Sequence, residues 1–299
     1  MTLLDLCQFD GIPAVEHASL HLVVERHCGD PADAQWLREN AWTVACRCDV
    51  SFSEHSRGMA EKMRHFARQV NIDATMTLLE ISKKQTETRQ RKPVFVFASS
   101  IAVFGIMPDF VTDDTPLKPQ MSYGAHKVVG EVMLNEFSRR GWVDGRALRF
   151  SPGVASKHGH SWSTGQLSAF LSDIIREVSQ GHAFVCPLSA QAKTWASSLP
   201  NIIENLVHGA ALDEGQLKDR RTFTLPTLYF SMAELVDAIG VVYKQKTDEL
   251  VRYQSNPVIE KLFGCFPPLE TPAADGVGFK HDGDINHLVK RALLNVNRK

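Results

Sequence analysis

The stretch that decides the fold is Val94-Phe-Val-Phe-Ala-Ser-Ser-Ile-Ala-Val-Phe-Gly105. With Pro93 before it, this stretch opens as a strand that is apolar on both faces, which is typical of a central strand in a parallel sheet. The strand ends in Ser99 and Ser100, and in open parallel sheets ligands bind at the carboxyl ends of the strands. Two hydroxyl groups are therefore expected where a substrate or a cofactor would lie.

Outward from this strand, the chain alternates short β-rich runs with helical patterns, which indicates parallel strands joined by helices. Strands are predicted over residues 2–6, 20–25, 43–48, 93–98, 147–150 and 222–225. Helices are predicted over residues 31–39, 59–82 (with a break near Asn71), 123–140, 167–179, 201–212, 231–241 (capped by Ser231) and 285–294, with a loop over 83–92. The fold class is therefore α/β: a Rossmann-like, doubly wound parallel sheet over residues 1–150, with a smaller substrate domain over 151–299. The strand near 222–225 is a candidate to return to the main sheet.

The composition is that of an ordinary soluble globular protein, with 43% hydrophobic and 22% charged residues in a chain of 299. A net charge of −1 provides no basic field for nucleic acid or for an acidic membrane surface. The longest apolar stretch, residues 94–107, is shorter than the ~20 residues of a membrane-spanning helix. The N-terminus has neither a basic region nor a cleavage pattern, so we expect no secretory signal.

The cysteines and histidines give no metal signature. The paired Cys46 and Cys48, like the paired His158 and His160, match no common zinc spacing. We therefore predict no metal site and interpret the cysteines as reduced, which favours a cytoplasmic location.

A second motif, Tyr123-Gly-Ala-His-Lys127, opens the next predicted helix. Tyr123 and Lys127 are four residues apart, so both project from one face of that helix. A phenol titrates near pH ~10, and a neighbouring ammonium group favours the phenolate and lowers that value. Tyr123 would then take the proton of a substrate alcohol while a nicotinamide takes the hydride. Lys127 would also contact the nicotinamide ribose, and Ser100 would hold the reacting oxygen.

These motifs resemble those of the extended short-chain dehydrogenases/reductases, the superfamily of NAD-dependent epimerases and dehydratases. Within it, the chain resembles most closely the D-erythronate dehydrogenase family. The similar stretches are residues 97–105, 113–124, 137–149, 174–177, 185–187, 204–211 and 256–260. The resemblance covers nearly the whole chain from about Thr2, and its middle block is the most specific part.

The resemblance implies an NAD-dependent oxidoreductase that oxidises a secondary alcohol of a small, D-erythronate-like sugar acid at C2. It implies Tyr123 as the catalytic base and Lys127 as its activator, with both residues also contacting the cofactor, and Ser100 as the orienting hydroxyl. Ser99 would border the nicotinamide, and Asn71 would shape the helix beside the cofactor. Taken alone, Asn71 reads as a polar residue that kinks or caps a helix. The family also pairs through the helix that carries Tyr and Lys, so a homodimer is implied.

The sequence departs from the family pattern at the cofactor loop. Among its 19 glycines, none forms a glycine-rich loop of the dinucleotide-binding or Walker type. The simplest alignment makes residues 2–5 the second strand, so that the first βα unit is missing and the edges of its neighbours are expected to be exposed. Asp5 then matches the acid that holds the adenosine ribose, which favours NAD over NADP, and Asp30 matches the acid near the adenine. Asp5 is equally read as a surface acid, and Asp30 as a helix cap.

A further departure concerns the substrate carboxylate. Residues 150–160 replace a segment that carries an arginine before Pro-Gly in the family. Arg149 and Lys157 are the candidates to take the place of that arginine.

Three functions stay open at this point. The first is an NAD-dependent dehydrogenase with a small-molecule sugar acid as its substrate, and with neither nucleic acid nor a membrane as a partner. The second is an inactive remnant or binding protein, because the pyrophosphate cradle is absent. The third is a nucleotide-sugar epimerase, since the same Ser/Tyr/Lys set serves that chemistry.

Overall fold

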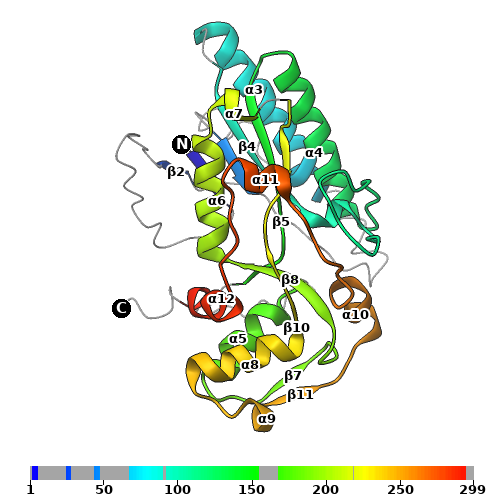
Figure 1. The fold of residues 1–299 in the computed structure, drawn as a ribbon. Helices are drawn as coiled ribbons and strands as arrows, with labels where there is room; N and C mark the ends of the chain where they lie inside the picture. Colours follow the sequence, from blue (N-terminus) through cyan, green and yellow to red (C-terminus); the bar gives the residue numbers. More distant parts are fainter. Residues whose placement is uncertain are drawn as a thin grey trace. The chain divides into compact units, whose positions relative to one another are not determined.

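The computed structural model describes residues 2–5, 25–27, 44–47, 67–89, 92–154, 168–217 and 219–293. The chain divides into two compact units, each assembled from separate segments. Unit 1 comprises residues 1–105, 117–149 and 208–223, and unit 2 comprises residues 106–116, 150–207 and 224–299. Figure 1 shows the elements of both units, coloured along the chain.

Unit 1 is built on a six-stranded sheet with the order β2-β1-β3-β4-β5-β9. Its strands are β1 (Thr2–Asp5), β2 (Glu25–His27), β3 (Val44–Arg47), β4 (Val94–Ser100), β5 (Asp144–Phe150) and β9 (Thr222–Thr224). The pairs of β1 with β2, β1 with β3 and β3 with β4 are parallel. The chain runs outward from β1 to β2 and then returns to β3 on the other side, so β1 and β3 flank a topological switch point.

The pairing of β1 with β3 differs from the expectation of exposed edges. In the Rossmann order 3-2-1-4-5-6, the second and fourth strands lie on either side of the first. Here the corresponding strands pair directly, with Thr2 opposite Val44 and Asp5 opposite Arg47. The facing edges of β1 and β3 are therefore hydrogen-bonded to each other and are not exposed.

Unit 1 adds helical elements to this sheet. They are η1 (Gln69–Asp73), a π-helical turn, with α3 (Ala74–Arg89), the 3-10 turn η2 (Ile101–Val103), α4 (Ser122–Arg139) and the short α7 (Glu214–Leu217). Figure 1 shows α3 and α4 packed side by side, and α4 contacts β4. The core between them contains Val70, Leu78, Leu79, Phe95, Phe97, Leu134 and Phe137.

The loop predicted over residues 83–92 is wrong, because α3 continues to Arg89. Its last two turns are polar, and their lysine, glutamine and glutamate residues are good helix formers. Thr86 also anchors this part of the helix, since its hydroxyl donates to the carbonyl of Trp142 at 2.5 Å.

An ionic network, buried at Arg146 and Asp144 and more exposed at Lys92 and Glu214, fastens residues 208–223 to β5. Asp144 accepts a hydrogen bond from Nη2 of the fully buried Arg146 at 2.8 Å and from Nη1 of Arg221 at 2.5 Å. Arg221 also donates to Glu214 at 2.8 Å, and Lys92 donates to the same carboxylate at 2.6 Å. Burial lowers the pKa of the Arg146 guanidinium, and the carboxylate of Asp144 offsets part of that effect.

Unit 2 combines two small sheets with a helical layer. Its strands are β6 (Gly153–Val154), β7 (Phe184–Cys186), β8 (Lys193–Ser198), β10 (Leu228–Ser231) and β11 (Val251–Tyr253), in the orders β10-β8-β6 and β11-β7. Its helices are α5 (Phe170–Ser179), α6 (Leu199–Ala211, whose last residues belong to unit 1), α8 (Met232–Tyr243), α9 (Thr247–Leu250), α10 (Pro257–Phe263), α11 (Pro272–Gly276) and α12 (Ile285–Ala292). No described helix is long and apolar enough to cross a membrane.

Two local features of unit 2 matter below. Ser231, the predicted cap, forms a full capping box with Glu234 at the start of α8. Residues 106–116 join unit 2 by pairing with a distant segment: the amide of Val111 donates to the carbonyl of Pro268, and the amide of Glu270 donates to the carbonyl of Val111. The middle of the stretch between Ser100 and Tyr123 therefore belongs to unit 2.

Candidate functional site

The predicted serines lie at the carboxyl end of β4. Ser99 is buried, and its hydroxyl donates to Oε1 of Glu131 at 2.5 Å. Ser100 is partly exposed and caps η2, its side chain accepting from the amide of Ala102 at 3.2 Å. The two hydroxyls therefore have different surroundings, and that of Ser100 is the more accessible one.

Tyr123 and Lys127 lie in the first turns of α4, as their spacing predicts. Lys127 is only 2% exposed, and its Nζ donates to the carbonyl of Ala98 at 2.8 Å. The same Nζ lies 5.3 Å from the ring centroid of Tyr123 and 5.1 Å from that of Phe97, within the range of cation–π attraction. The ammonium group is thus fixed between the end of β4 and the phenol.

Two glycines allow α4 to approach these elements so closely. A Cβ on Gly124 would lie 2.3 Å from the carbonyl oxygen of Ala102, and a Cβ on Gly130 would lie 2.4 Å from the ring of Phe97. Neither distance leaves room for a methyl group. Gly124, which directly follows Tyr123, is the sequence signal for this close contact.

Asn71 lies on the π-helical turn η1; the sequence predicts a break here, but the helix continues through η1 into α3. It is buried, and its Nδ2 lies 3.3 Å from Nδ1 of His126 on α4. Its backbone carbonyl accepts the hydroxyl of Thr75 at 3.0 Å. An amide nitrogen only donates, so in this contact Nδ1 of His126 is the acceptor. Asn71 thus joins η1 to the helix that carries Tyr123.

The surroundings of His126 make the stability of the fold depend on pH. Burial, together with the charges of Lys127 and Arg68, lowers the pKa of His126 below 6.5. The unfolded chain therefore binds this proton at a higher pH, so the contribution of His126 to stability declines as the pH falls below about 6.5.

We expect His126→Gln, which keeps an acceptor for Asn71, to lose less stability than the wild type on acidification. Urea unfolding above and below about pH 6.5 checks this, with the exposed His182→Gln as control; equal losses in wild type and His126→Gln would contradict it.

Glu131, which the sequence did not indicate as a site residue, binds both Ser99 and Arg149. Glu131 accepts Nε of Arg149 at 2.8 Å and Nη2 of Arg149 at 2.7 Å, in addition to the hydroxyl of Ser99. Arg149 is buried, and its guanidinium lies 5.3 Å from the ring centroid of Phe104. Arg149 is therefore engaged inside unit 1, which argues against its replacing the arginine that receives the substrate carboxylate. Lys157, the other candidate, lies outside the described residues.

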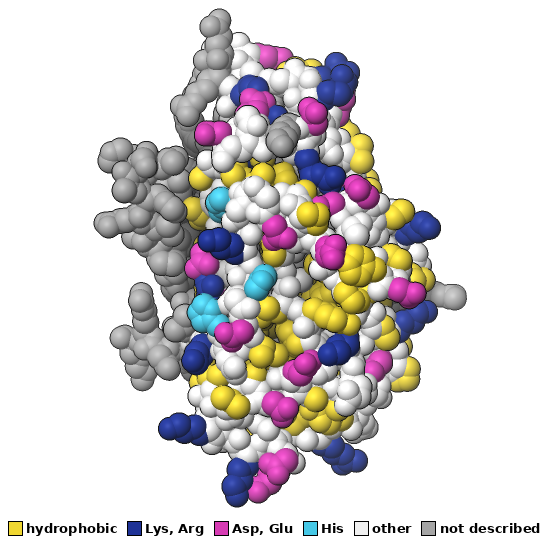
Figure 2. Space-filling model, viewed as in Figure 1, with side chains coloured by type: hydrophobic (Ala, Val, Ile, Leu, Met, Phe, Trp, Pro, Cys, Tyr) yellow, Lys and Arg dark blue, Asp and Glu magenta, His cyan; other side chains and the backbone are white. Residues whose placement is uncertain are grey.

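The remaining predicted positions are described only in part. Asp5 is the last residue of β1, beside the switch point, and Asp30 lies outside the described residues. Among the residues that the structure describes, no group of three His, Cys, Asp or Glu side chains could hold a metal ion. On the face drawn in Figure 2, the coloured acidic and basic side chains are interspersed.

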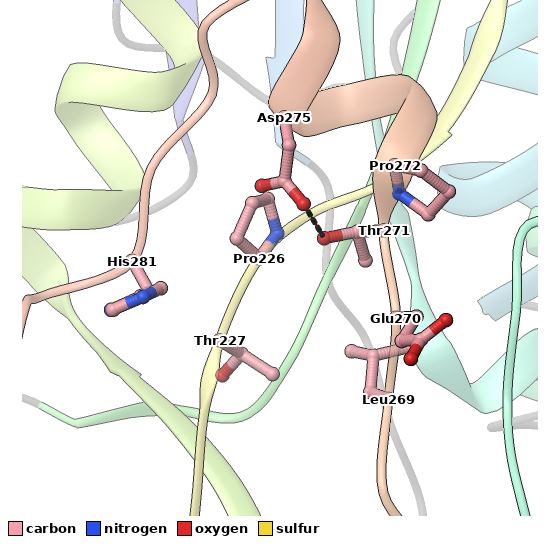
Figure 3. Close-up of a pocket in the computed structure, with 8 residues that line it drawn as sticks. All are labelled: Pro226, Thr227, Leu269, Glu270, Thr271, Pro272, Asp275 and His281. Carbon is pink, nitrogen blue, oxygen red and sulfur yellow. Dashed lines mark hydrogen bonds between the residues drawn. The ribbon is translucent and has the colours of Figure 1, made fainter.

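A separate hollow of about 420 Å³ lies within unit 2 (Figure 3). It is lined by Pro226, Thr227, Leu269, Glu270, Thr271, Pro272, Asp275 and His281. The hydroxyl of Thr271 donates to Asp275 at 3.3 Å, and that of Thr227 lies 2.8 Å from the hydroxyl of Ser151. These described lining residues include no lysine or arginine, so the hollow offers no permanent cation to a ligand carboxylate.

Comparison with known sequences identifies a matching family and similar proteins. The model of the NAD dependent epimerase/dehydratase family matches residues 15–194. The chain is 33% identical over 296 residues to D-erythronate dehydrogenase of Cupriavidus necator, covering 97% of this chain and 86% of that protein. It is 28% identical over 236 residues to D-erythronate dehydrogenase of Haemophilus influenzae, covering 78% of this chain and 73% of that protein.

Comparison with solved structures supports the fold. The chain is similar to the nucleoside-diphosphate-sugar epimerase from Agrobacterium tumefaciens, with a TM-score of 0.77, 26% identity, and coverage of 96% of this chain and 82% of that one. It is also similar to L-threonine dehydrogenase from Clostridium difficile, with a TM-score of 0.73, 23% identity, and coverage of 89% and 81%. The Rossmann-like α/β class predicted from the sequence is therefore confirmed.

Proposed function

The chain belongs to the NAD dependent epimerase/dehydratase family, and from this premise we propose that it is a nicotinamide-dependent dehydrogenase that oxidises a secondary alcohol of a small sugar acid. The observation that carries the proposal is the placement of Tyr123 and Lys127 on α4 beside the end of β4, with Nζ of Lys127 5.3 Å from the phenol ring. The two D-erythronate dehydrogenases among its relatives favour D-erythronate, oxidised at C2, as the substrate to test first.

The described residues fit a nicotinamide riboside by their chemistry. The ammonium of Lys127 and the partly exposed hydroxyl of Ser100 gather at the carboxyl end of β4, and they match the hydroxyl groups of that ligand. When bound, the oxidised nicotinamide supplies the hydride acceptor. Lys127 would hold its ribose, and Ser99 would border its ring.

The protein side of the reaction follows from the same placement. The hydroxyl of Ser100 orients the reacting alcohol by a hydrogen bond. Tyr123 accepts the proton of that alcohol as general base, and the ammonium group of Lys127 stabilises the phenolate that does so. Asn71 joins η1 to α4 through His126 and so steadies the helix that carries the base.

NAD is the preferred cofactor in this proposal. Asp5 is the last residue of β1, and its proposed role is that of the acid that binds the adenosine ribose. A carboxylate there repels the 2′-phosphate of NADP. Asp30 is proposed for the adenine side on the basis of sequence alone.

A homodimer through α4 is also proposed. Val129 and Val132 on α4 are 41% and 59% exposed, which leaves an apolar strip on the helix by which the family pairs. Light scattering of the purified chain tests this association, and a monomer at all concentrations would contradict it.

The decisive experiment joins cofactor binding with turnover. Calorimetry with NAD and NADP on the full chain is expected to give micromolar binding of NAD, weaker binding of NADP, and loss of most of the affinity in Lys127→Ala. Formation of reduced nicotinamide is then followed with D-erythronate, other sugar acids, a neutral polyol and a UDP-sugar. Turnover of a sugar acid supports the proposal, conversion of the UDP-sugar alone favours an epimerase, and folded protein without NAD binding favours the non-catalytic alternative.

A further inference from the structure

Glu131 continues the face of α4 that carries the proposed catalytic pair. Tyr123, Lys127 and Glu131 follow one another at four-residue spacing, which places them on one side of the helix. Glu131 is 2% exposed, and both of its carboxylate oxygens are engaged. Oε1 accepts Ser99 at 2.5 Å and Nε of Arg149 at 2.8 Å, and Oε2 accepts Nη2 of Arg149 at 2.7 Å.

Two consecutive residues of β4 are tied to this face of α4. The carbonyl of Ala98 accepts the ammonium of Lys127 at 2.8 Å, and the hydroxyl of Ser99 donates to Glu131. Ser100 follows directly and begins η2. The register of the strand end against the helix is therefore fixed by two hydrogen bonds immediately before the serine that would orient the substrate.

The pairing with Arg149 explains how a carboxylate can lie at this depth. A buried charge without a partner is strongly destabilising, so a buried ion pair persists only with close geometry and further hydrogen bonds. Arg149 provides a two-point contact, and the ring of Phe104 lies 5.3 Å from its guanidinium. Arg149 thus compensates the charge of Glu131, which leaves Glu131 placed to hold Ser99.

We propose that Glu131, compensated by Arg149, is a positioning residue of this site. It holds Ser99 and thereby sets the end of β4, with Ser100, against Lys127 and Tyr123. The consequence for turnover rests on the proposed function, whereas the consequence for the packing of Lys127 does not. If the pair of Glu131 and Arg149 served stability alone, a variant without the pair but of equal stability would protect Lys127 as well as the wild type does.

The test uses three variants of the full chain. The double variant Glu131→Leu/Arg149→Met removes both charges together, since removing one would leave the other buried and unpaired, whereas apolar replacement of both is often neutral for stability. Ser99→Ala removes only the hydroxyl. The control Glu136→Gln/Arg140→Gln removes an exposed ion pair further along the same helix.

The first readout is the rate at which an amine-reactive reagent modifies Lys127, followed by mass spectrometry at matched unfolding midpoints. We expect Lys127 to be protected in the wild type and the control, and to react about tenfold faster in the double variant through local opening. Lys127 is also expected to react faster in Ser99→Ala than in the wild type. If the double variant does not fold, the rate in Ser99→Ala decides the result. Lys127 protected as in the wild type would overturn the proposal.

The second readout is turnover, which separates this proposal from the proposed function. In an active wild type, the double variant and Ser99→Ala are expected to lower kcat about tenfold or more with little change in KM, because the reacting groups are misplaced. Unchanged kcat in both variants overturns the positioning role. A wild type without turnover refutes the proposed function alone, because the labelling of Lys127 still tests the positioning.

Discussion

Tyr123→Phe is expected to lower kcat by about 10²–10⁴-fold, the usual contribution of a general base. The substitution removes only the hydroxyl, so the ring keeps its place 5.3 Å from Nζ of Lys127 and the fold is retained. Binding of NAD should change little, because the ribose contact belongs to Lys127. The measurement is steady-state formation of reduced nicotinamide with the best sugar acid, beside calorimetry with NAD.

Tyr229→Phe is the matched control for this experiment. Tyr229 is 40% exposed on β10 in unit 2, and the same loss of a hydroxyl there should leave kcat unchanged. A Tyr123→Phe enzyme with wild-type kcat would remove Tyr123 from the chemistry. A loss of both binding and stability would instead assign the hydroxyl a structural role.

Asp144→Asn is expected to destabilise unit 1 by about 3–5 kcal/mol, as the loss of one partner of a buried ion pair does. The amide keeps the shape of the side chain but removes the charge that compensates two guanidinium groups. One of them, Arg146, is fully buried, and the other, Arg221, belongs to the segment that carries β9. Urea unfolding followed by circular dichroism measures the shift of the midpoint.

Asp73→Asn provides the comparison within the same unit. Asp73 and Arg68 form an ion pair whose side chains are about half exposed, at 44% and 52%. Loss of that pair should cost less than about 1 kcal/mol. Equal midpoint shifts for the two variants would show that the network around Asp144 contributes no more than a surface pair.

The proximity of the proposed site residues could be predicted from local patterns. An apolar strand that ends in Ser99 and Ser100, and a helix that opens with Tyr123 and Lys127, are both short-range signals. A parallel sheet brings strand ends and helix starts to the same edge, so the two motifs had to meet there. At Asn71, where a polar residue within a helical pattern predicts a break, the helix instead continues through a π-helical turn.

The partners of these residues could not be predicted in that way. Glu131 and Arg149 belong to different elements, and nothing in the spacing of either indicates that they meet in the core. The same holds for Asn71 and His126, which are joined across two helices. Such contacts depend on how elements pack, and a single sequence does not contain that information.

Unit 2 was the harder part for the same reason. Strands such as β7 (Phe184–Cys186) and β11 (Val251–Tyr253) have three residues each, too few to show alternation. They pair with each other in parallel from distant positions in the chain. The cap at Ser231 was predictable, because it depends on residues close in the sequence, with Glu234 three positions after Ser231.

The interleaving of the two units limits how the chain can be recombined in evolution or in the laboratory. A fragment that ends at residue 150 lacks β9, and with it the partners that Asp144 and Lys92 find in Arg221 and Glu214. The same cut separates residues 106–116 from the carbonyl of Pro268. The C-terminal half therefore cannot be exchanged as one block for the C-terminal half of a relative. A chimaera that changes substrate preference must keep residues 208–223 from the same parent as β5.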